Sequence, residues 1–315
     1  FQFEAKKGTI RLMNKVIRKV VTHASPDMDA ITSTWLILRF LPGWENAEVN
    51  FVPAGQRLGN LTPEQAVKLT EPIELINGAE VLQVDTGLGP LDHHQTSDKN
   101  VCGTSLTFDF IKKSVNEGVL STEKLEALQR IVNYVVEVDH FKEVFRKDLL
   151  ANYQNFSITD ILDGLKYQHP NDDRYYVEFI SLCLDALVHE LENNVWAETE
   201  IKEKGIEFET KWGKGLGVET INDTVVKMAQ LMGYMVVIRK DPRKGYVRIK
   251  AKPDLEGEKG IDLTLTSEKL KKMDPNASWF LHVSKKMLLN GTPKNPKMKP
   301  TTLSLNAIIG VLKEV

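Results

Sequence analysis

Carboxylate and imidazole side chains are concentrated in four short segments of the chain: HASPDMD at 23–29, VDTG at 84–87, LDHH at 91–94 and VDH at 138–140. Carboxylates that pack together repel one another, and their pKa values rise unless a cation neutralises them. A mixed set of carboxylates and imidazoles suits Mn²⁺ or a related transition ion better than Mg²⁺ alone. If the fold brings the four segments together, they predict a site for divalent cations.

The spacing within the first segment supports a site for two ions. His23 and Asp27 fall within one turn of loop, and Pro26 stiffens the chain between them. Asp29 follows two residues later, so it can face a second ion. Two divalent ions about 4 Å apart can activate a water molecule and clamp a phosphoryl group. A lone histidine or aspartate is usually structural, but four such segments at predicted strand ends or loops favour a metal site.

Strands and helices alternate around these segments. Short β-branched runs predict buried strands at 15–23, 47–55 and 79–87, and helical spacing predicts helices at 31–41, 103–118 and 122–140. Thr104 or Ser105 is the expected N-cap of the second helix. The alternation predicts an α/β fold with a parallel sheet covered on both faces. Ligands bind beyond the carboxyl ends of such strands, where His23 and Asp85 fall.

The same segments resemble a known family. THASPDMDAITS, QVDTG, LDHHQ and EVDH are similar, in this order, to the four motifs of the DHH phosphoesterase superfamily, over roughly residues 19–140. That superfamily includes manganese-dependent inorganic pyrophosphatases, RecJ-type single-strand exonucleases, and nucleases of very short RNAs or cyclic dinucleotides. The compact DTGLGPLDHHQ resembles its DHH-like nuclease branch named after the melanocyte-proliferating gene.

The resemblance implies a centre of two divalent ions, with Mn²⁺ favoured and Mg²⁺ or Co²⁺ as options. It assigns six residues to them: His23 and Asp27 to the first ion, Asp29, His93 and Asp139 to the second, and Asp85 to both. It also implies two catalytic residues, Asp92 and His94. Asp92 would orient a neighbouring imidazole, and His94 would face the substrate or assist the leaving group.

Simpler roles stay open for several of these residues. Asp92 could serve only as a helix N-cap, His94 could bind an ion in place of His93, and Asp139 could simply end a helical turn. His140 is expected to be structural. The start of the helix at residue 103 could present its N-terminus to a phosphate, or could be a plain cap.

The rest of the chain predicts a helical linker and a second, smaller α/β domain. The expected divisions are a DHH-type catalytic domain at 1–165, a linker at 166–212, with helix from 173 to about 211, and a substrate-binding domain at 213–315. In that last part, 234–253 predicts two strands around a DPRKG turn. Seven residues are the candidates for substrate binding there: Arg239, Lys240, His282, Lys285, Lys286, Asn290 and Gly291.

These candidates rest on charge and on a faint resemblance to DHH-associated domains. The arginine and lysine side chains could neutralise phosphates, or the lysines could simply form a solvated face. Tyr246, Trp279 and Phe280 could stack on a base, or could be core residues.

Composition limits the partners of the chain. Its 315 residues suffice for two domains, and its net charge of −2 excludes a whole-surface affinity for nucleic acid or anionic membranes. No apolar run reaches the roughly 18 residues that span a bilayer, and no secretory signal is visible. The two cysteines, Cys102 and Cys183, lack metal-ligand spacing, which predicts free thiols in the cytoplasm. Residues 1–12 precede the first methionine, and whether they are native stays open.

The sequence therefore predicts a two-metal phosphoesterase that hydrolyses phosphodiester bonds of short or single-stranded nucleic acid or of nucleotides. A pyrophosphatase or another small phosphoanhydride hydrolase is the alternative, and a non-catalytic nucleotide-binding module is a third. The complete set of ligand residues argues against the third. The short gap between Asp85 and Asp92 favours the first over the second. A homodimer is one option for the assembly.

Overall fold

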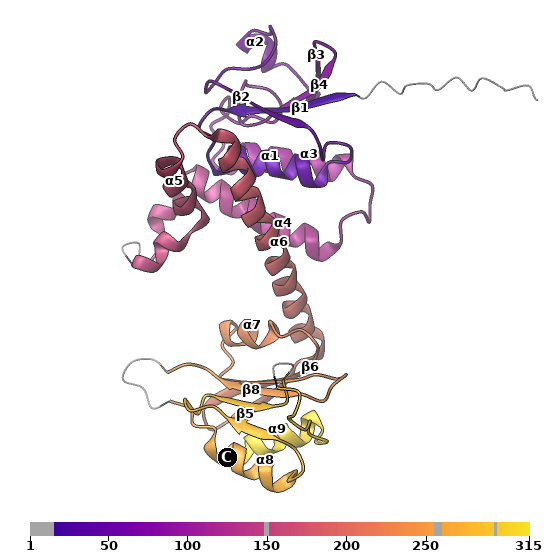
Figure 1. Ribbon diagram of the computed structural model, residues 1–315, viewed down its shortest axis with the longest axis vertical. Helices are drawn as coiled ribbons and strands as arrows, with labels where there is room; N and C mark the ends of the chain where they lie inside the picture. Colours follow the sequence, from indigo (N-terminus) through magenta and orange to yellow (C-terminus); the bar gives the residue numbers. More distant parts are fainter. Residues whose placement is uncertain (1–15, 148–150, 255–259, 293–294) are drawn as a thin grey trace, which may run out of the picture. The chain divides into compact units, whose positions relative to one another are not determined.

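The computed structural model describes residues 16–147, 151–254, 260–292 and 295–315 (Figure 1). The chain divides into two compact units between Val188 and His189, inside one long helix, and each unit has its own β-sheet. The predicted mixed α/β class is confirmed, whereas the predicted divisions at 165 and 212 stay predictions. Within the part of the chain that is described, no helix combines the length and apolar character needed to cross a bilayer. Residues 1–12 lie outside the described residues.

The sheet of the first unit has four strands in the order β2-β1-β4-β3, which are Glu48–Val52, Ile17–His23, Ala79–Gln83 and Ile73–Ile76. β1 is parallel to both β2 and β4. The expectation of a purely parallel sheet is wrong at the edge, because β3 is antiparallel to β4. Asn77 and Gly78 turn the chain between them with φ of +50° and +79°, and this backbone is typical of tight hairpins.

The two central strands of this sheet, β1 and β4, are largely buried. Helices α1 (Met28–Phe40) and α3 (Gly103–Ser114) pack side by side, and α4 (Thr122–Asp139) packs against both (Figure 1). Val21 and Val81 pack against Leu58, which lies in the loop that follows β2. That face is covered at this point by a loop rather than by a long helix, since α2 (Pro63–Ala66) is a single turn.

Short elements lead from α4 to the long helix. They are η1 (Lys142–Phe145), η2 (Asn152–Phe156), α5 (Ile158–Gln168) and α6 (Asp173–Lys204). The Trp35 Nε1–H of α1 donates to Asp185 of α6 at 2.8 Å, which ties the two helices together. The helix expected to reach residue 211 ends at Lys204, because the chain continues directly into a strand.

The second unit has a six-stranded sheet in the order β5-β6-β7-β8-β10-β9. Its strands are Ile206–Thr210, Gly213–Glu219, Val236–Lys240, Val247–Ala251, Met287–Asn290 and Trp279–Leu281 in that order. Its helices are α7 (Val225–Leu231), α8 (Thr264–Met273) and α9 (Leu305–Lys313). The predicted hairpin of β7 and β8 is confirmed. One sheet face packs its aliphatic side chains against buried residues of α8 and α9.

Candidate metal centre

The centre forms where parallel strands end. His23 is the last residue of β1, and Asp85 follows the end of the neighbouring strand β4. Asp27 caps α1, since its Oδ1 accepts hydrogen bonds from the backbone N–H groups of Asp29 and Ala30, both at 3.0 Å. Capping fixes this carboxylate at the helix N-terminus, where the helix dipole favours negative charge.

Two imidazoles lie on either side of Asp85. His23 Nε2 is 3.3 Å from Asp85 Oδ2 and 3.9 Å from Asp27 Oδ1. His93 Nε2 is 3.5 Å from Asp85 Oδ1, and 3.7 Å from both Asp29 Oδ2 and Asp139 Oδ2. The six residues that the family resemblance assigned to two ions therefore lie together. Asp85 presents one oxygen to each half of the group, although the role of each residue as a ligand stays a prediction.

Asp29 joins the centre to helix α3. Its two oxygens accept the backbone N–H groups of Gly103 at 2.7 Å and Thr104 at 2.6 Å. The expected N-cap at Thr104 or Ser105 is wrong, because Cys102 occupies that position and Asp29 binds the free amides. These two amides already donate to Asp29, so they are not free to bind a phosphate at the N-terminus of α3. A Cβ atom on Gly103 would lie 3.0 Å from Asp29 Oδ2, which explains the glycine.

Three buried polar atoms of the centre make no hydrogen bond within the described residues: Asp85 Oδ1, His93 Nε2 and Asp139 Oδ2. Leaving a buried donor or acceptor unsatisfied costs about 1–3 kcal/mol, and more for a charged group. These atoms converge, since His93 Nε2 is 3.5 Å from the first carboxylate oxygen and 3.7 Å from the second. A cation among them would satisfy all three, so the residues fit a transition ion.

The hydrogen bond of His23 also suits an ion. Its Nδ1 lies 2.9 Å from the carbonyl oxygen of Ala24, which can only accept, so Nδ1 carries the proton when the ring is neutral. The lone pair of Nε2 then points toward the carboxylates. Fixing one ring nitrogen in this way is the usual arrangement of metal-binding histidines.

The charges of the centre are strongly coupled. The contact with Asp85 raises the pKa of His93 to about 9 against the opposing effect of burial. Burial opposes protonation of His23 as well, but contacts with Asp85 and Ala24 raise its pKa to about 9. Burial, together with the charge of Asp85, raises the pKa of Asp29 to about 8. Burial also raises the pKa of Asp139. Without a metal ion, the centre therefore binds protons, which supply the positive charge that a metal ion would otherwise provide.

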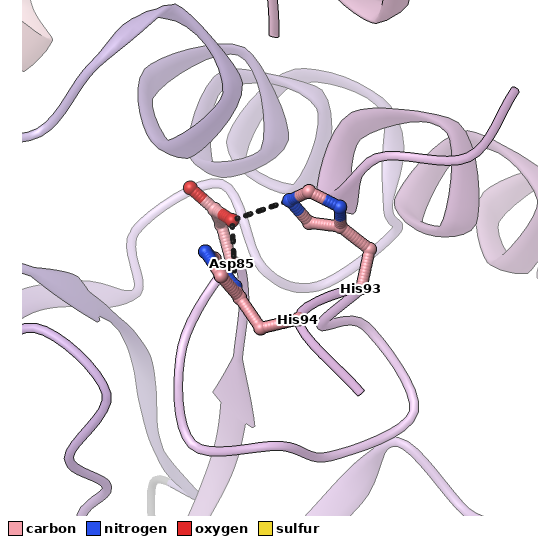
Figure 2. A group of neighbouring side chains, drawn as sticks. All are labelled: Asp85, His93 and His94. Carbon is pink, nitrogen blue, oxygen red and sulfur yellow. Dashed lines mark ion pairs between the residues drawn. The ribbon is translucent and has the colours of Figure 1, made fainter. Parts of the chain in front are cut away.

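The pair of Asp92 and His94 borders the centre. Asp92 is buried, and its Oδ1 lies 2.7 Å from His94 Nδ1, while its Oδ2 accepts the Leu88 N–H at 2.6 Å. Asp92 caps none of the described helices, so the reading of it as a mere N-cap is wrong. His94 is 59% exposed and its Nδ1 is 3.8 Å from Asp85 Oδ1. Figure 2 shows the Asp85 carboxylate facing both His93 and His94, so His94 as a ligand stays open.

Two further residues near the centre were not predicted to act there. His140 Nε2 lies 3.7 Å from Asp139 Oδ2 and 3.0 Å from the carbonyl oxygen of Val101. Lys166 of α5 donates from Nζ to the carbonyl oxygen of Ser25 at 3.2 Å. The motif VDH contains His140 and could have indicated it. No motif marks Lys166, because only the fold brings α5 to this loop.

Two cavities open on the centre. One has a volume of about 290 Å³ and includes His23, Asp85, Asp92 and His94 in its walls. The other has a volume of about 450 Å³ and is lined by Asp27, Asp29, Asp139, Arg146 and Lys166 among others. Both place candidate ligands beside solvent-filled space that a small anion could enter.

The seven candidate substrate residues of the second unit do not form one group. The strand register puts Arg239, Lys240, Asn290 and Gly291 at one end of the sheet and His282, Lys285 and Lys286 at the other. The four cations pair with carboxylates, namely Arg239 with Asp223 and Asp241, Lys240 with Glu219, Lys285 with Asp262 and Lys286 with Asp254. Their binding role stays a prediction.

The neutral candidates and aromatic residues of this unit have mainly structural contacts. Asn290 is buried and donates to the carbonyl oxygens of Ser278 and Lys299. A Cβ atom on Gly291 would overlap the ring of Tyr246. Trp279 belongs to the core, whereas Phe280 is half exposed.

Comparison with known proteins gives no family. No family model matches the chain, and no curated protein matches it. Among solved structures, it is similar to an uncharacterized protein from Helicobacter pylori G27, with 14% identity over 87% of this chain and 93% of that chain, at a TM-score of 0.25. A putative family II inorganic pyrophosphatase from Methanococcus jannaschii shows 16% identity over 94% and 99%, at 0.21. A pGpG-specific phosphodiesterase from Vibrio cholerae shows 12% identity over 89% and 94%, at 0.20. Because these TM-scores are low, the three structures carry no argument about the function of this chain.

Proposed function

We propose that this protein is a metal-dependent phosphoesterase that hydrolyses phosphodiester bonds of short or single-stranded nucleic acid or of nucleotides. One observation supports it above all others. Three buried polar atoms, on Asp85, His93 and Asp139, make no hydrogen bond among the described residues, and they converge within a group of two imidazoles and four carboxylates. Such a group is costly to fold without cations, and its donors are those that Mn²⁺ accepts.

The chain would hold two divalent ions with His23, Asp27 and one oxygen of Asp85 on one side, and with Asp29, His93, Asp139 and the other Asp85 oxygen on the other. When bound, such ions supply Lewis acidity, which lowers the pKa of water and offsets the charge of a phosphoryl group. No residue of the site is required as a covalent nucleophile.

The remaining chemistry falls to the pair of Asp92 and His94. The buried Asp92 carboxylate accepts the Nδ1–H of His94 and leaves Nε2 to carry or release a proton. His94 is exposed toward solvent, so it can donate from Nε2 to the oxygen of a leaving group. Lys166, beside Ser25 in the larger cavity, can neutralise a phosphate oxygen of a bound substrate.

The preference for phosphodiesters over pyrophosphate rests on the loop between Asp85 and His93. This short loop resembles that of the nuclease branch of the superfamily. In addition, the lysine side chains of the second unit pair mostly with carboxylates and do not form a dense phosphate-binding site. A nucleic-acid substrate would therefore be short, because few phosphates can be neutralised at once.

A direct test uses three substrates with the full-length protein and Mn²⁺: pyrophosphate, a dinucleotide and a single-stranded oligonucleotide. The variant Asp85→Asn removes the carboxylate shared by both halves of the site. Asp109→Asn serves as a matched control, because Asp109 is an exposed aspartate of the same unit that pairs with Lys112. We expect cleavage of the dinucleotide or oligonucleotide by the parent and the control, but not by Asp85→Asn.

Two outcomes contradict the proposal. Turnover of pyrophosphate alone would establish a phosphoanhydride hydrolase in its place. Binding of nucleotides without turnover of any of the three substrates would indicate a non-catalytic module.

A further inference from the structure

The loop that carries Asp85 has a backbone that needs outside support. Asp85, Gly87 and Leu88 have φ of +49°, +77° and +59°. Residues other than glycine rarely adopt this left-handed region, and they keep it only where the surroundings hold them. The position of the Asp85 carboxylate between His23 and His93 depends on this conformation.

Arg57, from the loop after β2, supports that backbone from outside the centre. Its Nη1 donates to the carbonyl oxygen of Gly87 at 2.7 Å. A Cβ atom on Gly87 would lie 2.7 Å from Arg57 Cβ, so only glycine permits this approach. Next to it, the hydroxyl of Thr86 donates to the carbonyl oxygen of Gln56, also at 2.7 Å. Two successive residues of the strained loop are thus held by the same neighbouring segment.

Arg57 is itself held by Glu74, and Gln83 in turn holds Glu74 in place. The Arg57 Nη2 donates to Glu74 Oε1 on β3 at 2.6 Å, and the same oxygen accepts the Gln83 Nε2–H of β4 at 2.8 Å. Gln83 Oε1 in turn accepts the Leu58 N–H at 2.7 Å. The side chains of Arg57 and Glu74 are only 8% and 11% exposed, so water screens this ion pair little. A buried, multiply bonded pair of this kind fixes geometry more than it adds stability.

We propose that Arg57, oriented by Glu74 and Gln83, is a positioning residue for the metal centre. It holds the loop of residues 85–88 from behind and thereby sets the Asp85 carboxylate between the two histidines. None of its hydrogen bonds or ion pairs among the described residues reaches a candidate ligand. The inference rests on the proposed function only in taking the centre to bind cations.

The same sheet offers a matched control at its other end. Arg18 of β1 pairs through Nε with Glu80 Oε2 of β4 at 2.7 Å and donates from Nη1 to the carbonyl oxygen of Gly43 at 2.6 Å. Gly43 also has a positive φ, of +84°. Arg18 thus makes the same types of contact as Arg57, but it lies at the opposite end of β1 from His23.

The test compares Arg57→Met, Arg57→Lys and Arg18→Met in two measurements on the full chain. The first is amide hydrogen exchange of the metal-free proteins, where the Asp85 N–H donates to the Leu91 carbonyl and the Leu88 N–H to Asp92. The second is Mn²⁺ affinity by equilibrium dialysis. We expect Arg57→Met to speed exchange in this loop, and to weaken Mn²⁺ binding, each at least tenfold relative to Arg18→Met.

Arg57→Lys keeps the charge and most of the volume, and a single ammonium cannot reproduce the two-pronged contact, so intermediate values are expected. This variant also decides the question if Arg57→Met does not fold. Equal exchange and equal Mn²⁺ affinity in the Arg57 and Arg18 variants would overturn the positioning role. If the parent binds no Mn²⁺, the proposed function fails, while hydrogen exchange still decides whether Arg57 holds the loop.

Discussion

Replacing Asp85 with asparagine keeps the shape of the side chain and removes the charge that both halves of the centre share. The two carboxylate oxygens of Asp85 lie 3.3 Å from His23 Nε2 and 3.5 Å from His93 Nε2, and Asp85 is only 3% exposed. Removing one partner of a buried charge interaction costs about 3–5 kcal/mol. Because 1.4 kcal/mol is a factor of ten, we expect the Mn²⁺ affinity to fall roughly 100- to 4,000-fold.

The same substitution has a pH-dependent effect on the metal-free protein. Below the pKa of about 9 of His23 and His93, both imidazoles are protonated, so losing Asp85 removes their partner and lowers the melting temperature. Above that pH both rings are neutral, and Asp85 only repels Asp29 and Asp139. There the asparagine relieves repulsion, and the melting temperature rises.

Equilibrium dialysis with Mn²⁺ measures the affinity, and calorimetric unfolding at pH 7 and pH 10 measures the stability, with Asp109→Asn as the exposed control. Parental Mn²⁺ affinity in Asp85→Asn would refute the shared role of this carboxylate. If Asp85→Asn melted at a lower temperature than the parent at both pH values, the charge arrangement derived from the distances would be refuted.

Further predictions concern protons, catalysis and metal removal. At pH 7 the metal-free centre holds protons on His23, His93 and Asp29, whose pKa values are raised to about 9, 9 and 8, so Mn²⁺ affinity should rise with pH up to about 9. Calorimetry in buffers of different ionisation enthalpy should show proton release, and none would contradict this. In the metal-free protein, the two histidines stabilise the fold fully below pH 6.5, and this contribution is lost as the pH rises through about 9; unfolding scans should show the loss. Asp92→Asn should lower kcat by roughly 10²–10⁴-fold, because Asp92 orients His94, while Mn²⁺ affinity should stay within about threefold. Equal losses of kcat and of Mn²⁺ affinity would show that Asp92 is a metal ligand instead. Mn²⁺ at about 100 times its Kd should add about 2.7 kcal/mol and raise Tm by roughly 5–10 °C, reversed by a chelator, and an unchanged Tm would exclude specific binding.

Sequence predicted the strands and helices around the centre well because their signals are local. The β-branched runs ending at His23 and near Asp85 mark buried strands, and parallel neighbours place their carboxyl ends together. The hairpin strand β3 was not predicted, although Asn77-Gly78 carries the turn signal for it. The end of α6 was placed too late, because the charged run around Lys204 continues into β5 without a change of composition.

Contacts between distant segments could not be predicted in this way. Ser and Thr are the usual N-caps, so sequence favoured Thr104 or Ser105, but Asp29 reaches that helix from 74 residues away. The support of Asp85 by Arg57 depends on the approach of a separate loop, which no local pattern encodes. The basic residues of the second unit fall in two separate pairs, Arg239-Lys240 and Lys285-Lys286, and the strand register places these pairs at opposite ends of the sheet.

The capping of α3 by Asp29 has a consequence for ion selectivity. This carboxylate is anchored by two backbone amides, which resist an outward swing that would lengthen its bonds to a larger ion. Ca²⁺ prefers 6–8 oxygen donors at 2.3–2.6 Å in adaptable surroundings. A frame this stiff, with imidazoles among its donors, should discriminate against calcium by size and donor type alike.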